Sequence, residues 1–96
     1  MNSRQRAYLK SLASNLNPVF QIGKGTLTPE ITEAVRECFN THELIKISVL
    51  NNCLEDPKEM AQILADRTGS EVVQVIGKKI VLYKKDTKNQ KIELPK

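Results

Sequence analysis

The residues best suited to chemistry lie in one short stretch, from Gln21 to Pro29, where Gly23 and Gly25 flank a lysine. The apolar residues at 18–22 predict a strand before it, and Thr28 followed by proline predicts a helix start with Thr28 as N-cap. Glycines let backbone N–H groups approach a ligand, a helix N-terminus carries partial positive charge, and lysine adds a full charge. This pattern is typical of an anion site, and phosphate is the obvious anion.

Two nucleotide-binding motifs do not fit this stretch. A P-loop needs a glycine at the position of Pro18 and a Ser or Thr at the position of Gly25. A dinucleotide fingerprint read from Gly23 would need a glycine at Thr28. A nucleotide-binding enzyme is therefore disfavoured. Two interpretations remain: a loop that clamps a phosphodiester backbone, as GxxG loops do in KH-type RNA modules, or an ordinary tight turn with a solvated lysine.

Other chemistry-bearing residues predict no catalytic or metal site. Cys38 and His42 have a spacing that can hold metal on a helix, but no further ligand of matching type is nearby. The second cysteine, Cys53, is not expected to form a disulfide in a reducing cytosol. No pair of acids with a base accompanies residues 23–28, hereafter the glycine turn, so we expect no catalysis, cofactor or small-molecule substrate.

Charge is unevenly distributed along the chain. Residues 1–28 carry four basic residues and no acid, residues 29–71 carry four basic residues and nine acids, and residues 72–96 carry seven lysines and two acids. If the fold brings the two basic ends together, one face becomes a surface for polyanions and the acidic face repels them. Evenly scattered surface lysine is the alternative.

The length of 96 residues predicts one domain, 1–96, with a basic and loosely ordered tail from about residue 86. No apolar run is long enough for a membrane helix and the N-terminus lacks an apolar signal region, so we expect a cytoplasmic protein.

Hydrophobic periodicity predicts an α/β fold with the order α-β-α-β-α-β-β. Helices are expected at about 3–15, 29–41 and 57–68, and strands at 18–22, 43–50, 72–76 and 80–84. Such a chain forms a four-stranded mixed sheet with packed helices, in which the second helix connects two strands that we expect to be parallel. Ile92 and Leu94 could add one short pairing from the tail.

The same patterns assign faces to individual residues. Lys46 should point from an uncovered sheet face, and the outer face of the second helix carries acids that would repel RNA. Ile63 and the four aromatic residues are expected in the core, which leaves little material for base stacking. This favours recognition of structured RNA by its backbone and shape.

Several segments together resemble the CRM (chloroplast RNA splicing and ribosome maturation) domain, in its stand-alone bacterial, YhbY-like form. They cover almost the whole chain in the right order: 5–10 (QRAYLK), 19–25 (VFQIGKG), 42–47 (HELIKI) and 74–83 (QVIGKKIVLY). The resemblance implies a fold like the C-terminal domain of translation initiation factor three. It also implies RNA binding through a GxxG-type loop and adjacent basic surface, in a factor acting on ribosomal RNA of large-subunit precursors.

One position departs from the family pattern. The family loop usually reads Gly-Lys-x-Gly, whereas the fourth position here is Thr26, a β-branched residue that poorly tolerates positive φ. Either Gly25 supplies the flexibility one residue earlier, or Thr26 donates its hydroxyl to a phosphate oxygen.

The sequence thus predicts a non-catalytic, monomeric RNA-binding protein. The alternative is a ribosome-associated adaptor that binds a protein through the acidic face of the second helix. The residues expected to contact RNA are Arg4, Arg6, Lys10, Gly23, Lys24, Gly25, Thr26, Thr28, Lys46, Lys78 and Lys79.

Overall fold

Polar side chains cap the first turn of each helix in the computed structural model, which describes residues 1–23, 27–88 and 90–95. Such caps satisfy backbone N–H groups that have no partner inside the helix. In chain order the elements are α1 (Ser3–Ala13), β1 (Phe20–Ile22), α2 (Pro29–Cys38), β2 (Leu44–Val49), α3 (Pro57–Thr68), β3 (Glu71–Ile76) and β4 (Lys79–Tyr83). The predicted α/β order is confirmed.

The caps of α2 and α3 are those that the sequence predicted. Thr28 Oγ1 accepts a hydrogen bond from the backbone N–H of Ile31 at 3.2 Å, and Asp56 Oδ1 accepts one from Lys58 at 3.0 Å. Gly69 ends α3 with a φ of 70°, a left-handed conformation that glycine adopts without strain. The capping box of α1, formed by Asn2 and Gln5, was not predicted.

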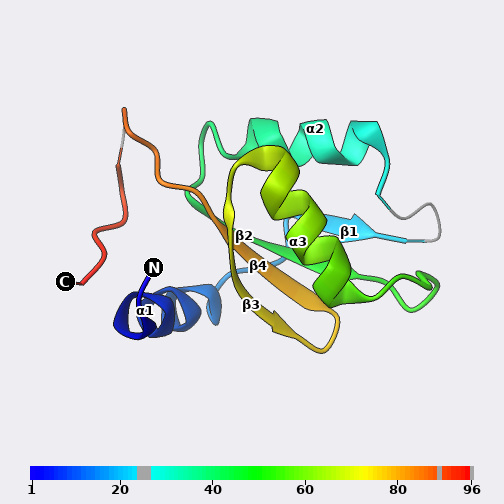
Figure 1. The fold of residues 1–96 in the computed structure, drawn as a ribbon, viewed down its shortest axis with the longest axis horizontal. Coiled ribbons are helices and arrows are strands. Elements are labelled where there is room, and N and C mark those ends of the chain that lie inside the picture. Colours follow the sequence, from blue (N-terminus) through cyan, green and yellow to red (C-terminus); the bar gives the residue numbers. More distant parts are fainter. Residues whose placement is uncertain (24–26, 89, 96) are drawn as a thin grey trace.

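The four strands form one mixed sheet in the order β1-β2-β4-β3 (Figure 1). β1 pairs with β2 in parallel, and β2–β4 and β4–β3 are antiparallel. The parallel pair confirms the expected crossover through α2, because parallel neighbours cannot be joined by a tight turn. The carboxyl ends of β1 and β2 therefore lie at the same end of the sheet as the turn between β3 and β4.

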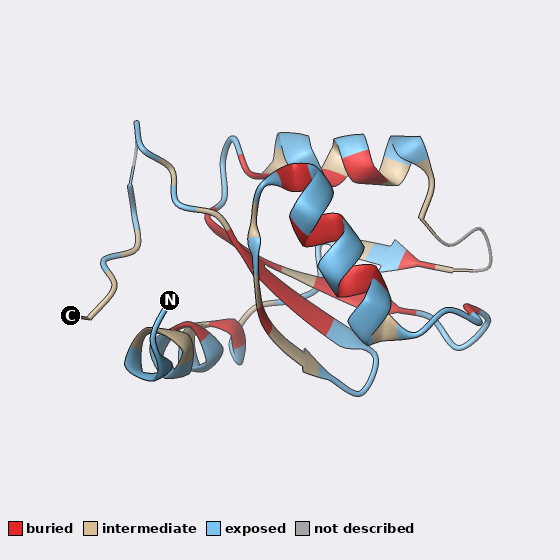
Figure 2. Ribbon diagram, in the orientation of Figure 1, coloured by how far each residue is buried: buried red, intermediate tan, exposed pale blue. Residues whose placement is uncertain are grey.

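Helices cover both faces of the sheet, which produces two hydrophobic clusters (Figures 1 and 2). α2 and α3 pack on one face, and α1 lies on the other, against β2 and β3. In β2, Ile45 and Ile47 belong to the α2–α3 side, whereas Leu44 faces α1. Alternating side chains of β2 thus pack into both clusters.

Two residues expected in the core are exposed. The side chain of Tyr8 on α1 is 39% exposed, and that of Ile63 on α3 is 40% exposed. Both lie one position off the buried stripe of their helix, where Leu9 and Leu64 are fully buried. The helical period places neighbouring residues about 100° apart, so a wide apolar stripe in sequence includes positions at its edge that remain in solvent.

The tail is fastened to the domain by one carboxylate that the sequence analysis did not single out. Glu43, only 4% exposed, precedes β2 and accepts hydrogen bonds from the backbone N–H groups of Asp86 (3.1 Å), Ile92 (2.9 Å) and Lys91. Ile92 and Leu94 then pack against the hydrophobic cluster under α1. Among the described tail residues, the short pairing suggested for these two is replaced by side-chain packing.

These bonds shift the acidity of Glu43. Burial acts to raise the pKa of its carboxyl group, but the N–H donors of Lys91, Asp86 and Ile92 favour the charged form and lower the pKa below the ordinary 4.5. A lowered folded-state pKa contributes stability that is present above the unfolded value. That stability is lost as the pH falls through the folded value.

We expect Glu43→Gln to lower the free energy of unfolding at neutral pH by about 1.5–3 kcal/mol, because a charge-assisted acceptor is lost and one oxygen is replaced by a donor. The variant should also lose less stability than the wild type when the pH is lowered from neutral to below 4.5. Urea unfolding at a series of pH values measures both effects. Glu93→Gln, the same change at an exposed tail residue, is the control. Equal behaviour of the two variants would contradict this role of Glu43.

Candidate nucleic-acid interface

Gly23 follows the carboxyl end of β1, and Thr28 precedes the N-terminus of α2 (Figure 1). Open α/β sheets commonly bind ligands at this position. Gly23 is described, and Thr28 caps the helix as expected. Lys24, Gly25 and Thr26 lie outside the described residues, so the two accounts of Thr26 remain predictions.

The loop after β2 lies beside Gly23. A Cβ atom added to Gly23 would lie 3.3 Å from Asn52 Oδ1 and 3.5 Å from the Cδ1 atom of Leu50. The segment after β2 therefore approaches the glycine backbone closely. Gly23 provides this space through its missing side chain, since its φ is not positive. The amide of Asn52 is exposed next to the turn and is a polar residue that the sequence analysis missed.

The hairpin lysines lie at the same end of the sheet. The backbone N–H of Val49 donates to the carbonyl oxygen of Lys78 at 2.7 Å, which fastens the β3–β4 turn to the end of β2. Lys78 and Lys79 are both exposed. The parallel pairing and this hairpin thus bring Gly23 and two predicted lysines to one end of the sheet.

A row of polar residues crosses the sheet from Lys79 of β4 to Gln21 of β1. Ser48 of β2 is paired with Gln21 of β1 and with Lys79 of β4, and it accepts a hydrogen bond from Lys79 Nζ at 2.8 Å. Gln21 is exposed and lies two residues before Gly23. This row belongs to the face that carries α1.

The same face contains a hollow of about 170 Å³ between α1 and the sheet, hereafter the lysine hollow. It corrects the expectation that Lys46 points from an uncovered face, because α1 covers part of that face and Lys46 is half-buried. The Nζ atom of Lys46 donates to the carbonyl oxygen of Leu16 at 3.3 Å. The residues lining the hollow are Lys10, Ala13, Ser14, Lys46, Gln74, Ile76, Lys79 and Val81.

The two arginines of α1 are placed differently from the lysines. Arg6 Nη1 donates to the carbonyl oxygens of Val72 and Val73 at 2.7 and 2.9 Å, where the register of β3 shifts. It therefore fastens α1 to an irregular point of the sheet. Arg4 lies one turn N-terminal to Tyr8, and its side chain is exposed. Neither lines the lysine hollow.

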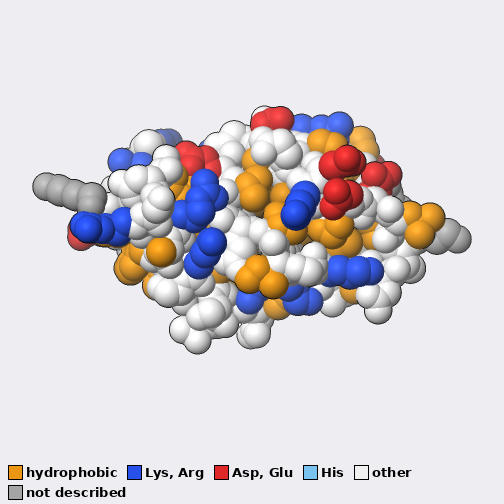
Figure 3. Space-filling view, turned by 60° about the horizontal axis from the view of Figure 1, so that its bottom comes forward, with side chains coloured by type: hydrophobic (Ala, Val, Ile, Leu, Met, Phe, Trp, Pro, Cys, Tyr) orange, Lys and Arg blue, Asp and Glu red, His pale blue; other side chains and the backbone are white. Residues whose placement is uncertain are grey.

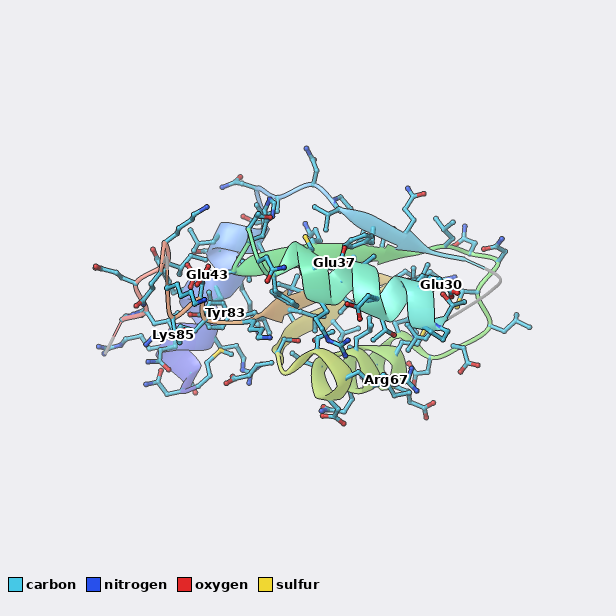
Figure 4. The ribbon with its side chains drawn as sticks, turned by 90° about the horizontal axis from the view of Figure 1, so that it is seen from above. Glu30, Glu37, Glu43, Arg67, Tyr83 and Lys85 are labelled. Carbon is cyan, nitrogen blue, oxygen red and sulfur yellow. The ribbon has the colours of Figure 1, made fainter. Side chains whose placement is uncertain are left out.

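Acidic side chains gather on another part of the surface. Glu30 and Glu37 project from α2, on the far side of the sheet from α1 (Figure 4). Glu33 of the same helix forms a salt bridge with Arg36 at 2.5 Å. On the face shown in Figure 3, basic and hydrophobic side chains occur together across much of the surface, and a group of acidic side chains lies toward one end of it. The fold thus separates an acidic helix face from the basic side near α1.

The described residues contain no cluster of potential metal ligands. Within 1–23, 27–88 and 90–95, no three His, Cys, Asp or Glu side chains lie close enough together to hold a metal ion. Cys38 Sγ is 3.8 Å from His42 Nδ1, and burial raises the pKa of the Cys38 thiol, which disfavours a reactive thiolate. In these same ranges no helix is long and apolar enough to cross a membrane.

Comparison with known proteins identifies the family. The family model of the CRS1 / YhbY (CRM) domain matches residues 1–84. The chain belongs to the CRM family. The fold agrees with that of a solved relative: it has a TM-score of 0.83 to the solution structure of SAV1595 from Staphylococcus aureus, a candidate RNA-binding protein, with 44% sequence identity and 99% of each chain covered. The resemblance and fold predicted from the sequence are confirmed.

Two curated relatives span the same length. A Bacillus subtilis protein named "Probable RNA-binding protein YqeI" is 42% identical to this CRM domain, and the match covers 99% of each chain. A Haemophilus influenzae protein named as an RNA-binding protein is 33% identical, over 100% of this chain and 96% of its own. The names of these relatives indicate RNA-binding proteins and describe no catalysis.

Sequence reasoning missed four polar residues that lie beside Gly23 or on the side of the sheet that carries α1. Each is a short or amide side chain with no charge to attract notice. Three of them lie in strands and could have been found from the two-residue alternation once the strand order was known, whereas Asn52 lies in the loop after β2. These residues are Gln21, Ser48, Asn52 and Gln74.

We expect Thr28→Ala to lower the free energy of unfolding by about 1 kcal/mol, because the N–H of Ile31 loses its acceptor. Thr28→Ser keeps the hydroxyl oxygen and should retain most of that stability. Urea denaturation of both variants measures the difference. If alanine and serine were equally stable at this position, the cap would contribute nothing to the helix that follows the glycine turn.

Proposed function

We propose that this CRM domain is a non-catalytic, cytoplasmic RNA-binding protein that binds, as a monomer, structured ribosomal RNA of large-subunit precursors. The observation that carries the proposal is the convergence of three features at one end of the sheet. These are Gly23 after β1, the N-terminus of α2 and the hairpin lysines 78–79. Helix N-termini and lysines attract phosphate, glycine lets a ligand approach the backbone, and several such features suit a polymer with many phosphates.

The proposed contacts divide by role. Backbone N–H groups of 23–26 and the start of α2 would bind a phosphate directly, with Lys24 providing the charge. Lys78 and Lys79 would bind neighbouring phosphates, and Lys10 and Lys46 would extend the positive field along the face of α1. Arg6 would act mainly through the position of α1, since its guanidinium already donates to two carbonyl oxygens.

The shape of the surface favours folded RNA over a single strand read by stacking. Phe39 and Tyr83 are each 5% exposed, and Phe20 packs against the core. Only Tyr8 among the aromatic residues is substantially exposed, on a helix away from the glycine turn. An extended strand bound by stacking would need a series of aromatic platforms. Recognition of paired RNA by its backbone and helix geometry needs no aromatic platforms.

The test is a salt series of binding to bacterial large-subunit ribosomal RNA for wild type and Lys24→Glu. We expect log affinity to fall linearly with log salt, with a slope of about 0.7–0.9 per neutralised phosphate, and a shallower slope in the variant. Lys85→Glu is the matched control, because it makes the same charge reversal at the end of the molecule distant from the start of α2 (Figure 4). Its slope should remain closer to that of the wild type.

Two outcomes would contradict the proposal. Undetectable binding of the wild type to the RNA would exclude direct RNA recognition of this target. Ribosome association that survives Lys24→Glu and is abolished by reversing Glu33 and Glu37 would instead support the adaptor function of the acidic α2 face.

A further inference from the structure

The lysine hollow combines positive charge with apolar lining residues. Attraction of an RNA backbone phosphate requires the charge but not the apolar residues. Ile76 and Val81 line it from β3 and β4, and Ala13 lines it from α1. Ile76 is 61% exposed, although it lies in a strand that pairs along its length with β4. A large apolar side chain in this position remains in contact with water unless a ligand covers it.

Two lysines that line the hollow each form one hydrogen bond within the protein and retain N–H groups that can bind a ligand. Lys46 Nζ donates to the carbonyl oxygen of Leu16 at 3.3 Å, and Lys79 Nζ donates to Ser48 Oγ at 2.8 Å. An ammonium group has three donors, so one such bond fixes its position and leaves others available. Lys10 supplies a third, exposed cation from α1.

The charge of the lining selects an anion. The eight lining residues include three lysines and no acid. Ser14 and Gln74 add neutral groups that can form hydrogen bonds with a polar edge. A volume of about 170 Å³ has room for several water molecules, so the hollow accommodates a body attached to the anion.

A single nucleotide has this combination of properties. Its phosphate is the anion, its base has an apolar face, and the edge of that base carries donors and acceptors. A fatty chain would not use Gln74 and Ser14, and a free phosphate would not use Ile76. The hollow also adjoins the proposed RNA surface, because Lys79 lines the hollow and is one of the proposed phosphate-binding residues.

We propose that the lysine hollow receives one unpaired nucleotide of the bound RNA, with its phosphate against the lysines and its base over Ile76 and Val81. The inference rests on the proposed function and adds a requirement to it. The RNA element would be a helix with a bulged or looped-out nucleotide, since proteins read unstacked bases far more readily than the bases of a continuous RNA helix.

The first experiment compares a perfectly paired RNA hairpin with the same hairpin carrying one bulged uridine. The wild type should prefer the bulged hairpin by about fivefold to tenfold, the effect of one added base contact. Ile76→Thr keeps a β-branched residue in β3 and should remove the preference while leaving affinity for the paired hairpin unchanged. Ile63→Thr, at an exposed isoleucine of α3 on the other side of the sheet, should keep it.

The second experiment locates the nucleotide without depending on RNA binding. Uridine 5′-monophosphate is titrated into the protein while the methyl NMR signals of Ile76 and Val81 are observed. We expect these signals to shift more with this nucleotide than with ribose 5-phosphate, which lacks the base, or uridine, which lacks the phosphate.

The outcomes separate this inference from the proposed function. Equal affinity for the two hairpins, both bound and both weakened by Lys24→Glu, would overturn the nucleotide site and leave the RNA-binding proposal standing. The wild type could instead bind neither hairpin and no ribosomal RNA, while its methyl signals shift with the mononucleotide. That result would overturn the RNA proposal and support the hollow as a nucleotide site. Methyl signals that do not move at any ligand concentration would overturn the hollow itself.

Discussion

The parallel pairing of β1 with β2 is the constraint on which the functional arrangement depends. Two parallel strands need a long connection, and α2 provides it. The start of α2 must then follow the end of β1, which lies with Gly23 beside the end of β2. Because β4 runs antiparallel to β2, its hairpin with β3 returns to the same place. Backbone topology alone therefore collects groups that are more than fifty residues apart in sequence, such as Gly23 and Lys78.

β2 also determines which side of the sheet is basic. Ile45, Ile47 and Val49 fill the cluster under α2 and α3, while Lys46 and Ser48 face the side of α1. A shift of one residue in the pairing would bury the lysine and expose three apolar residues, so the register is strongly fixed by burial. The acids of α2 lie on the outside of the opposite layer. Charge separation is thus a consequence of the same alternation that builds the core.

Local patterns predicted the elements well, because each signal was carried by adjacent residues. Helix ends were marked by Thr28-Pro29, Asp56-Pro57 and Gly69. These residues act through capping hydrogen bonds and local backbone conformation, which depend little on distant contacts. The short strand at Phe20–Ile22 was predicted two residues too long, since Pro18 and Val19 lie outside it. The family pattern added the order of the segments, and the solved relative agrees with it.

Features that depend on distant contacts could not be predicted in this way. Nothing near Glu43 in the sequence indicates that backbone groups 43 to 49 residues away would surround it. Lys46 was correctly assigned to a face, but the covering of that face by α1 depends on how Leu9 and Ala13 pack on the sheet. The lysine hollow has the same origin, because its lining comes from α1, β2, β3 and β4.

The position of the two chain ends has a consequence for how the domain can be combined with others. The N-terminus and the tail fastened by Glu43 both lie at the end of the molecule opposite the start of α2 (Figure 1). A fusion partner at either end would therefore not obstruct the start of α2. Several copies joined head to tail would keep their linkers distant from this end of each copy. Engineering a multivalent reagent from this domain would need only a linker between neighbouring ends, with no change to the domain itself.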